Sequence, residues 1–241
     1  ENVGIYGNIF RNNTLRGIDL KNVYQGQYIK NVRCYDNLCV DNADSGIGFQ
    51  VNVAGVIPSD IDIFNNRVIG SESTTGVGIR LEGFEDGCNC YDNQIKNYQY
   101  GIRLIDSNNA EVYRNFVRQS LCIQIEIQLD SSSSNNKIYN NDLKTTLPSV
   151  TCINLTPAAV NTVVYNNKGS NGGSTYRITN SGVGTIMYMN EVGYSNTSPT
   201  GRATQGEIWW NNTPSANGYM GWVAVTTSSS STFKGFSAIQ T

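Results

Sequence analysis

The chain has 241 residues, of which 15% are charged and 39% are hydrophobic, and its formal net charge is −2. This length fits one elongated repeat domain or one large globular domain. The near-neutral charge predicts no general affinity for nucleic acid or anionic membranes, and no apolar run approaches the roughly 20 residues of a membrane-inserted helix. The many Gly, Asn, Ser and Thr residues indicate a β-rich, turn-rich protein.

A short phrase recurs eight times along the chain: an apolar residue, an aromatic residue, a spacer and then Asn. The aromatic residues are Tyr6, Tyr35, Phe64, Tyr91, Tyr113, Tyr139, Tyr165 and Tyr188. The Asn residues are Asn8, Asn37, Asn66, Asn93, Asn115, Asn141, Asn167 and Asn190. Steps of 22 to 29 residues between these Asn residues are typical of one supersecondary unit per coil, with insertions placed in loops.

The unit around Asn93 shows how each coil is expected to fold. Cys90 points inward and Tyr91 outward by the two-residue period of a strand, and a second strand places Ile102 and Leu104 inside. Strands of successive coils then pair in parallel, about 4.8 Å apart. The repeated Asn is expected to form a column of amide-to-amide hydrogen bonds at a buried turn, with eight independent Asn-favouring turns as the alternative.

Cysteines occupy apolar positions of the same pattern. Cys34 and Cys90 take the apolar position of the phrase, and Cys39 a second apolar position two residues after its Asn. We therefore expect core thiols rather than a disulfide framework. Cys88 and Cys90 lack a partner cluster, so no metal site is expected.

This pattern resembles the right-handed parallel β-helix repeat of the pectate-lyase-like superfamily, over roughly residues 1–194. From Ser195 the repeat stops, and 206–214, 221–226 and 233–236 predict three short strands. The expected fold is therefore all-β: a right-handed single-stranded parallel β-helix of about eight coils (1–194) with a small C-terminal β tail (195–241). The tail is expected to cap the last coil; a sugar-binding or trimer-clamping module built on Trp209, Trp210 and Trp222 is the alternative.

The tail segments Gly206–Asn211, Gly221–Val223 and Phe233–Phe236 also look like the terminal segment of phage tailspike and related surface β-helix proteins. That resemblance implies a homotrimer on the virion tail, outside the cell, that binds and often cleaves bacterial capsule or O-antigen polysaccharide. It implies no cofactor. Because Glu1 leads directly into a repeat, the chain is expected to be part of a longer protein.

Several chemistries of β-helix enzymes are not supported by the sequence. The chain has no His, which removes Ser–His–Asp and Cys–His schemes and the His of polygalacturonase-like enzymes. The calcium-binding Asp cluster of pectate lyases is not evident, and the Tyr-Gly-x-Asp-Pro signature of mannuronan epimerases is absent. The remaining candidates for catalytic groups are the carboxylates of Asp and Glu, so we expect a glycosidase more than a lyase if the chain is an enzyme.

Alignment of the second strands predicts an outward polar flank. The first expected column consists of Asp19, Gln50, Arg80, Arg103, Glu126 and Asn154. The next position along the strands is expected to form a second column of Asn52, Glu82, Ile105, Gln128 and Thr156. The residues that follow the strands include Glu85, Asp106 and Asp130. Glycoside hydrolysis needs two carboxylates, about 5 Å apart for retention or about 6.5–9.5 Å apart for inversion. The catalytic candidates are Glu82, Asp106 and Glu126. The substrate-binding candidates are Arg80, Arg103, Tyr98, Tyr100, Asp130 and Glu85.

Three functions stay open: a polysaccharide depolymerase, a non-catalytic adhesin for the same polymers, and a purely structural fibre segment. The flank could hold ordinary cross-strand ion pairs, or it could be a non-catalytic sugar-binding groove. The outward aromatic column could be buried against partner chains around a three-fold axis, covered by loops, or used to stack sugars. The loops at 52–59, 71–75 and 129–135 are further binding candidates.

Overall fold

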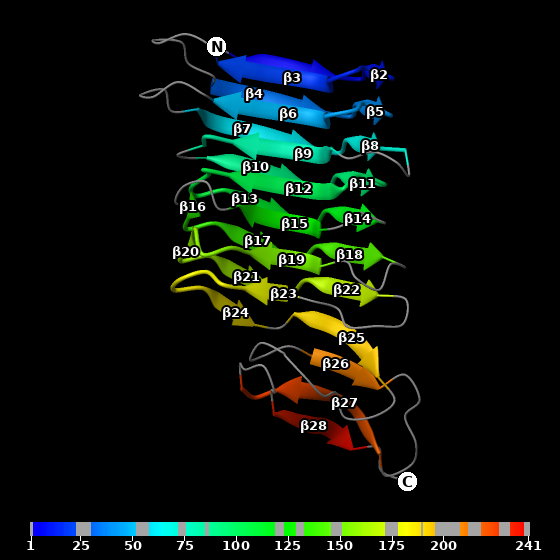
Figure 1. Ribbon diagram of the computed structural model, residues 1–241, viewed down its shortest axis with the longest axis vertical. Coiled ribbons are helices and arrows are strands. Elements are labelled where there is room, and N and C mark those ends of the chain that lie inside the picture. Colours follow the sequence, from blue (N-terminus) through cyan, green and yellow to red (C-terminus); the bar gives the residue numbers. More distant parts are fainter. Residues whose placement is uncertain are drawn as a thin grey trace.

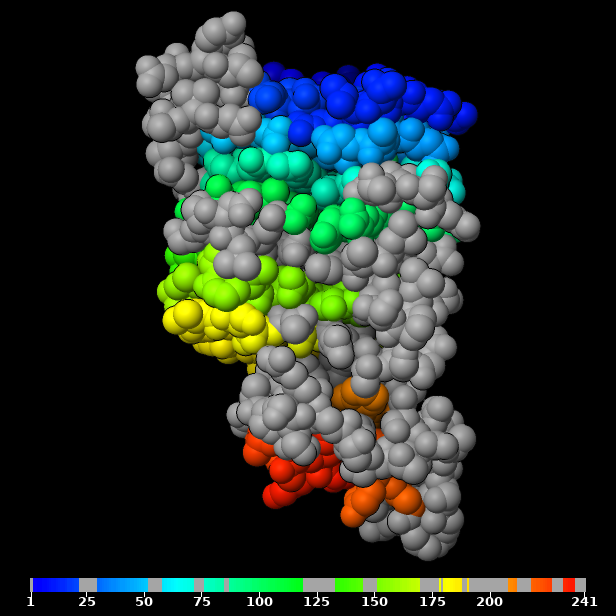
Figure 2. All heavy atoms as spheres, in the orientation of Figure 1, coloured from blue at the N-terminus to red at the C-terminus, as the bar shows by residue number. Residues whose placement is uncertain are grey.

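The computed structural model describes residues 2–22, 30–51, 58–71, 76–84, 87–118, 123–128, 133–145, 151–171, 178–188, 190–195, 208–211, 218–226 and 232–238. In this part of the chain the regular elements are all strands, stacked as coils along one axis (Figure 1). The space-filling view shows the coils as layers that run from the N-terminal end to the tail (Figure 2). The predicted parallel β-helix is thus confirmed.

Each of the first seven coils contributes one strand to each of three parallel sheets, and the described part of the eighth coil contributes to the first two sheets. The first sheet consists of β1 (Val3–Tyr6), β4 (Lys30–Tyr35), β7 (Ser59–Phe64), β10 (Cys88–Tyr91), β13 (Glu111–Tyr113), β17 (Lys137–Tyr139), β21 (Val163–Tyr165) and β24 (Ile186–Tyr188). The helical part of the second sheet consists of β2 (Ile9–Arg11), β5 (Leu38–Val40), β8 (Arg67–Ile69), β11 (Gln94–Lys96), β14 (Phe116–Arg118), β18 (Asp142–Thr145), β22 (Lys168–Asn171) and β25 (Glu191–Ser195).

The third sheet is broader, because its strands are longer. It consists of β3 (Arg16–Asn22), β6 (Ser45–Val51), β9 (Val77–Glu82), β12 (Tyr100–Ile105), β15 (Ile123–Gln128), β19 (Thr151–Leu155) and β23 (Ile178–Asn180). For β15 the structure describes the backbone alone. A small fourth sheet pairs β16 (Ser133–Ser134) with β20 (Ala159–Val160).

The interior is a column of apolar side chains from all three sheets. Cys34, Ile63 and Cys90 follow one another on the first sheet and have no exposed surface. Burial raises the pKa of the Cys34 and Cys39 thiols to about 12, so both stay protonated and behave as small apolar side chains. The predicted core role of these cysteines is confirmed.

The repeated Asn residues form the predicted ladder. Each Nδ2 donates to Oδ1 of the Asn in the next coil, at 2.9–3.2 Å, in seven consecutive steps from Asn8 to Asn190. Each Oδ1 also accepts the backbone N–H of the preceding Asn, at 2.9–3.1 Å. The other Nδ2 hydrogen reaches a main-chain carbonyl one coil back, at 2.8–3.0 Å. A carboxylate has no N–H to donate, which explains why Asp never takes this place.

The spacer before each ladder Asn turns the chain. Seven of these spacers have positive φ, between 52° and 67°: Gly7, Asp36, Asn65, Asp92, Arg114, Asn140 and Asn166. Gly, Asn and Asp tolerate this left-handed conformation best, so Arg114 is the exception. The carboxylate of Asp92 accepts hydrogen bonds from Nε and Nη2 of Arg114 at 2.8 and 2.6 Å, which stabilises the left-handed conformation of Arg114.

The aromatic residues form a continuous outward stack. From Tyr6 to Tyr165, ring centroids of neighbouring coils lie 4.9–5.0 Å apart and the ring planes differ by at most 12°. Tyr6, in the first coil, is 60% exposed, whereas the rings from Tyr35 to Tyr165 are half-buried. The outward aromatic column is confirmed for these seven rings; the Tyr188 side chain lies outside the described residues.

Three further strands follow the β-helix, as the tail sequence predicts. β26 (Ile208–Asn211) continues the second sheet in parallel with β25, and β27 (Tyr219–Ala224) and β28 (Phe233–Ala238) extend it antiparallel. Trp209 and Trp222 lie opposite each other and are buried, so these two indoles stabilise the tail from inside. They are not an exposed sugar-stacking platform.

Replacing a central ladder amide is expected to destabilise the fold strongly. In Asn93→Ala the backbone N–H and Nδ2 of Asn66 lose their acceptor inside the protein, and we expect the free energy of unfolding to fall by about 3 kcal/mol. Asn8→Ala is the control, because Asn8 is exposed and no described Asn donates to it, so its loss is expected to stay below about 1 kcal/mol. Urea unfolding measures both, and equal losses would contradict the ladder's role.

Candidate functional site

The third sheet brings together most of the predicted polar flank. Arg80, Arg103, Glu126 and Asn154 lie opposite one another on β9, β12, β15 and β19. Asp19 belongs to the same column, but Gly48 takes the place predicted for Gln50. Gln50 lies two residues further on, opposite Glu82, where Asn52 was predicted. The second column is therefore Lys21, Gln50, Glu82, Ile105 and Gln128.

The incorrect prediction for Gln50 has a local cause. Residues 41–44 connect β5 to β6, whereas residues 70–76 connect β8 to β9, so the third coil inserts three extra residues between the second and third sheets. Gly48 also has a packing role, because an added Cβ would lie 2.8 Å from Cδ of Arg16. The Arg16 guanidinium binds Asp44 at 2.7 Å and Asp19 at 2.6 Å. The carboxylates at the N-terminal end of the flank are therefore held in ion pairs.

Glu82 is held by its neighbours. Arg80 donates to Oε2 of Glu82 from Nη2 at 2.8 Å and from Nε at 3.0 Å, and Gln50 donates to the same oxygen from Nε2. The side chains of Arg80 and Glu82 are only 23% and 20% exposed. Three donors on one oxygen fix Glu82 in place, so this carboxylate has a structural function whatever else it does.

The other two catalytic candidates lie at different places. Asp106 follows β12 directly, on the coil next to Glu82, since the backbone of Gly83 donates to Ile105 at 3.0 Å. Its φ is 51°, and its Oδ1 is buried with no hydrogen-bond partner among the described residues. Glu126 is in the arginine column, two strands and two residues from Glu82, or about 12 Å between Cα atoms. The geometry thus brings Glu82 nearer to Asp106 than to Glu126.

The predicted substrate-binding residues do not all lie at one surface. Arg103 covers the Tyr100 ring, with its guanidinium carbon 4.3 Å from the ring centroid. Tyr98 does not lie at the surface as predicted: it is completely buried and donates its hydroxyl to the Asn42 carbonyl at 3.2 Å. It fills the interior beside Gly46, so its assignment to glycan contact is wrong. Glu85, Asp130 and most of the predicted binding loops lie outside the described residues.

Stacking also limits what the aromatic column can do. Each ring between Tyr6 and Tyr165 has a neighbouring ring on both faces at about 5 Å, so these faces are closed to a sugar. Only ring edges and hydroxyl groups remain available. One hydroxyl is already used, because Tyr139 donates to Glu111 at 2.8 Å, and Glu111 also accepts from Lys137 at 2.7 Å.

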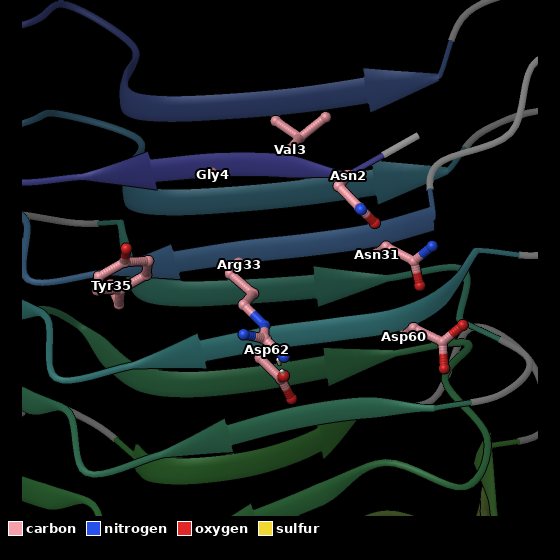
Figure 3. A pocket seen from close by; sticks show the side chains of 8 residues that line it. All are labelled: Asn2, Val3, Gly4, Asn31, Arg33, Tyr35, Asp60 and Asp62. Atoms are coloured by element: carbon pink, nitrogen blue, oxygen red, sulfur yellow. Dashed lines mark ion pairs between the residues drawn. The ribbon is translucent and has the colours of Figure 1, made fainter.

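A pocket on the first sheet was missed by the sequence analysis. It has a volume of about 470 Å³ and lies on β1, β4 and β7 (Figure 3). Its lining residues are Asn2, Val3, Gly4, Asn31, Arg33, Tyr35, Asp60 and Asp62. Figure 3 shows Arg33 and Asp62 side by side, Asn31 and Asp60 at one end and Tyr35 at the other.

The pocket results from the outward column beside the aromatic stack. That column reads Gly4, Arg33, Asp62, Asn89, Glu111 and Lys137. Gly4 has no side chain, which leaves space above Arg33. Nε of Arg33 lies 3.8 Å from Oδ2 of Asp62, and Asn89 donates to Oδ1 of Asp62 at 3.1 Å. The signal in the sequence was a polar residue two places before five of the eight aromatic residues, and these polar residues form a surface only once the register is known.

Among the described residues no group of three or more His, Cys, Asp or Glu side chains could hold a metal ion. In the same part of the chain, no helix has the length and apolar character needed to span a membrane.

Comparison with known proteins identifies no family for this chain. No protein-family model matches the chain, and no curated protein matches it. A solved structure of the A-module of a mannuronan C-5 epimerase from Azotobacter vinelandii aligns with a TM-score of 0.43 and 15% identity, over 77% of this chain and 53% of that one. The chain therefore spans about half of that module, and this likeness does not extend to activity.

Proposed function

We propose that this chain binds bacterial surface polysaccharide, with the pocket on the first sheet as a sugar-binding site. The pocket carries the proposal. Its volume of about 470 Å³ is in the range of small-ligand sites. Arg33, Asp62 and Asn31 offer planar groups with paired donors or acceptors, which match neighbouring hydroxyl groups of a sugar ring.

We further propose that the chain belongs to a phage tailspike-type protein, exposed on the virion tail. Support comes from the resemblance of the repeat and of the tail segments to such proteins. The mixed charges of the pocket, with Arg33 beside Asp62 and a further carboxylate at Asp60, suit a hydroxyl-rich ligand better than an apolar one.

Removing the paired charges of the pocket is expected to weaken glycan binding. In the double variant Arg33→Met, Asp62→Asn, charge-assisted hydrogen bonds to sugar hydroxyls are lost, and we expect affinity to fall about tenfold or more. Binding would be measured on an array of purified capsule and O-antigen polysaccharides. Lys21→Met on the third sheet is the control. Equal binding by wild type and double variant would exclude this pocket as the site.

A homotrimer is the proposed assembly. It is supported by the resemblance of the tail and by the long outward aromatic stack, whose edges would be buried against partner chains. Light scattering at micromolar concentration should give three times the mass of one chain. A monomeric mass would refute the trimer for this chain.

Glycoside hydrolysis is a second candidate function, favoured by one observation. A buried carboxylate oxygen without a hydrogen-bond partner, as in Asp106, is unusual and calls for a functional explanation. With Glu82 on the adjacent coil, it could form an acid–base pair.

Substitution of the three carboxylates tests this activity. If wild type releases reducing ends from a polysaccharide, the triple variant Glu82→Gln, Asp106→Asn, Glu126→Gln should lose about 100-fold or more of that rate. Asp19→Asn, on the same sheet, is the matched control, and urea unfolding checks that the triple variant is folded. Full activity in the triple variant would remove these residues from catalysis.

A further inference from the structure

The pocket on the first sheet carries one negative charge that its own lining residues do not balance. Its lining contains one basic side chain, Arg33, and two carboxylates, Asp60 and Asp62. The Asp62 carboxylate is already held, because Nε of Arg33 lies 3.8 Å from its Oδ2 and Asn89 donates to its Oδ1 at 3.1 Å. The charges of Arg33 and Asp62 therefore offset each other, and the charge of Asp60 is left over.

The Asp60 carboxylate is open to a ligand. Asp60 is an exposed residue near the start of β7, and its Oδ2 accepts from the neighbouring Ser59 hydroxyl at 3.3 Å. It forms no ion pair with any residue that the structure describes. Gly87 occupies the corresponding position on the next coil, and a Cβ added there would lie 3.9 Å from Oδ1 of Asp60. Because glycine has no side chain, residue 87 leaves that side of the carboxylate uncovered.

An ammonium group is the partner that suits this end of the pocket. It carries a positive charge and three N–H donors, whereas an ionised carboxylate only accepts. Figure 3 shows Asn31 at the same end as Asp60, and the side-chain carbonyl of Asn31 offers a further acceptor. One strand spacing and two residues separate the Cα atoms of Arg33 and Asp60, or about 8 Å, so a ligand of one or two sugar units reaches both.

We propose that the pocket selects an amino sugar, a sugar unit with a free, protonated amino group. Asp60 binds the ammonium, and Arg33 and Asp62 bind ring hydroxyls. This inference rests on the proposed function, and it adds the charge of the sugar unit that the pocket takes. An acidic sugar fits less well, because its carboxylate would repel Asp60 and compete with Asp62 for Arg33. An N-acetylated sugar brings no charge to offset Asp60.

The test compares a short glucosamine oligosaccharide with its fully N-acetylated form, which has the same length and linkage. Calorimetry at mildly acidic pH keeps the sugar amines protonated and the aspartates ionised. Wild type is expected to bind the amine form about fivefold more tightly, which is the upper range for one charge pair at a solvent-accessible site. In Asp60→Asn the two forms should bind equally, because Asn keeps the shape of the side chain and loses its charge.

Asp36→Asn is the matched control. Asp36 is exposed, has a φ of 55° where Asp60 has 57°, and lies outside the pocket, so this variant removes the same charge from another place. It is expected to keep the preference of wild type for the amine form. Equal loss of preference in both variants, equal affinity of wild type for both forms, no measurable binding of the amine form, or tighter binding of polygalacturonate would overturn the proposal.

The polysaccharide array separates this inference from the proposed function. If array binding depends on Arg33 and Asp62 while wild type shows no preference for the amine form, the proposed function stands and this inference fails. If neither array binding nor oligosaccharide binding responds to any pocket variant, both fail. Asp60→Asn is expected to keep the unfolding temperature of wild type, because Asn tolerates the positive φ of residue 60.

Discussion

The amide ladder is the interaction on which the rest of the structure depends. Each Asn of the repeat satisfies a backbone N–H, an amide and a main-chain carbonyl across successive coils, inside a turn that water does not reach. It therefore fixes both the rise and the lateral register of every coil. The aromatic stack depends on this ladder, because each ring lies two residues before a ladder Asn and therefore repeats at the spacing of the coils.

That fixed spacing decides which surfaces are available for binding. The faces of the aromatic rings are covered by the rings of neighbouring coils, so the repeated aromatic residues cannot stack on sugars. Ion pairs hold part of the third-sheet flank, as Arg80 with Glu82 shows. What remains is a pocket of mixed charge on the first sheet.

The pocket suits the proposed binding of polysaccharide. The pocket offers paired hydrogen-bonding groups, which discriminate between sugars by the positions of their hydroxyls. A rigid coil stack holds the pocket without requiring long loops to fold around the ligand.

The sequence by itself determined the coil: the strand alternation, the inward Cys34 and Ile102, the Asn ladder and the outward tyrosines all follow from local two-residue periodicity and from the chemistry of the amide. It also predicted the three tail strands, since turn residues bound each of them. Only the tertiary structure decided what lies beside what. Because three extra residues precede β9, Glu82 pairs with Gln50 in the register. Tyr98 is buried in the core, where the small residue Gly46 leaves space for its side chain. The pocket at Arg33 likewise depends on register between coils, which loop lengths set and which no local pattern encodes.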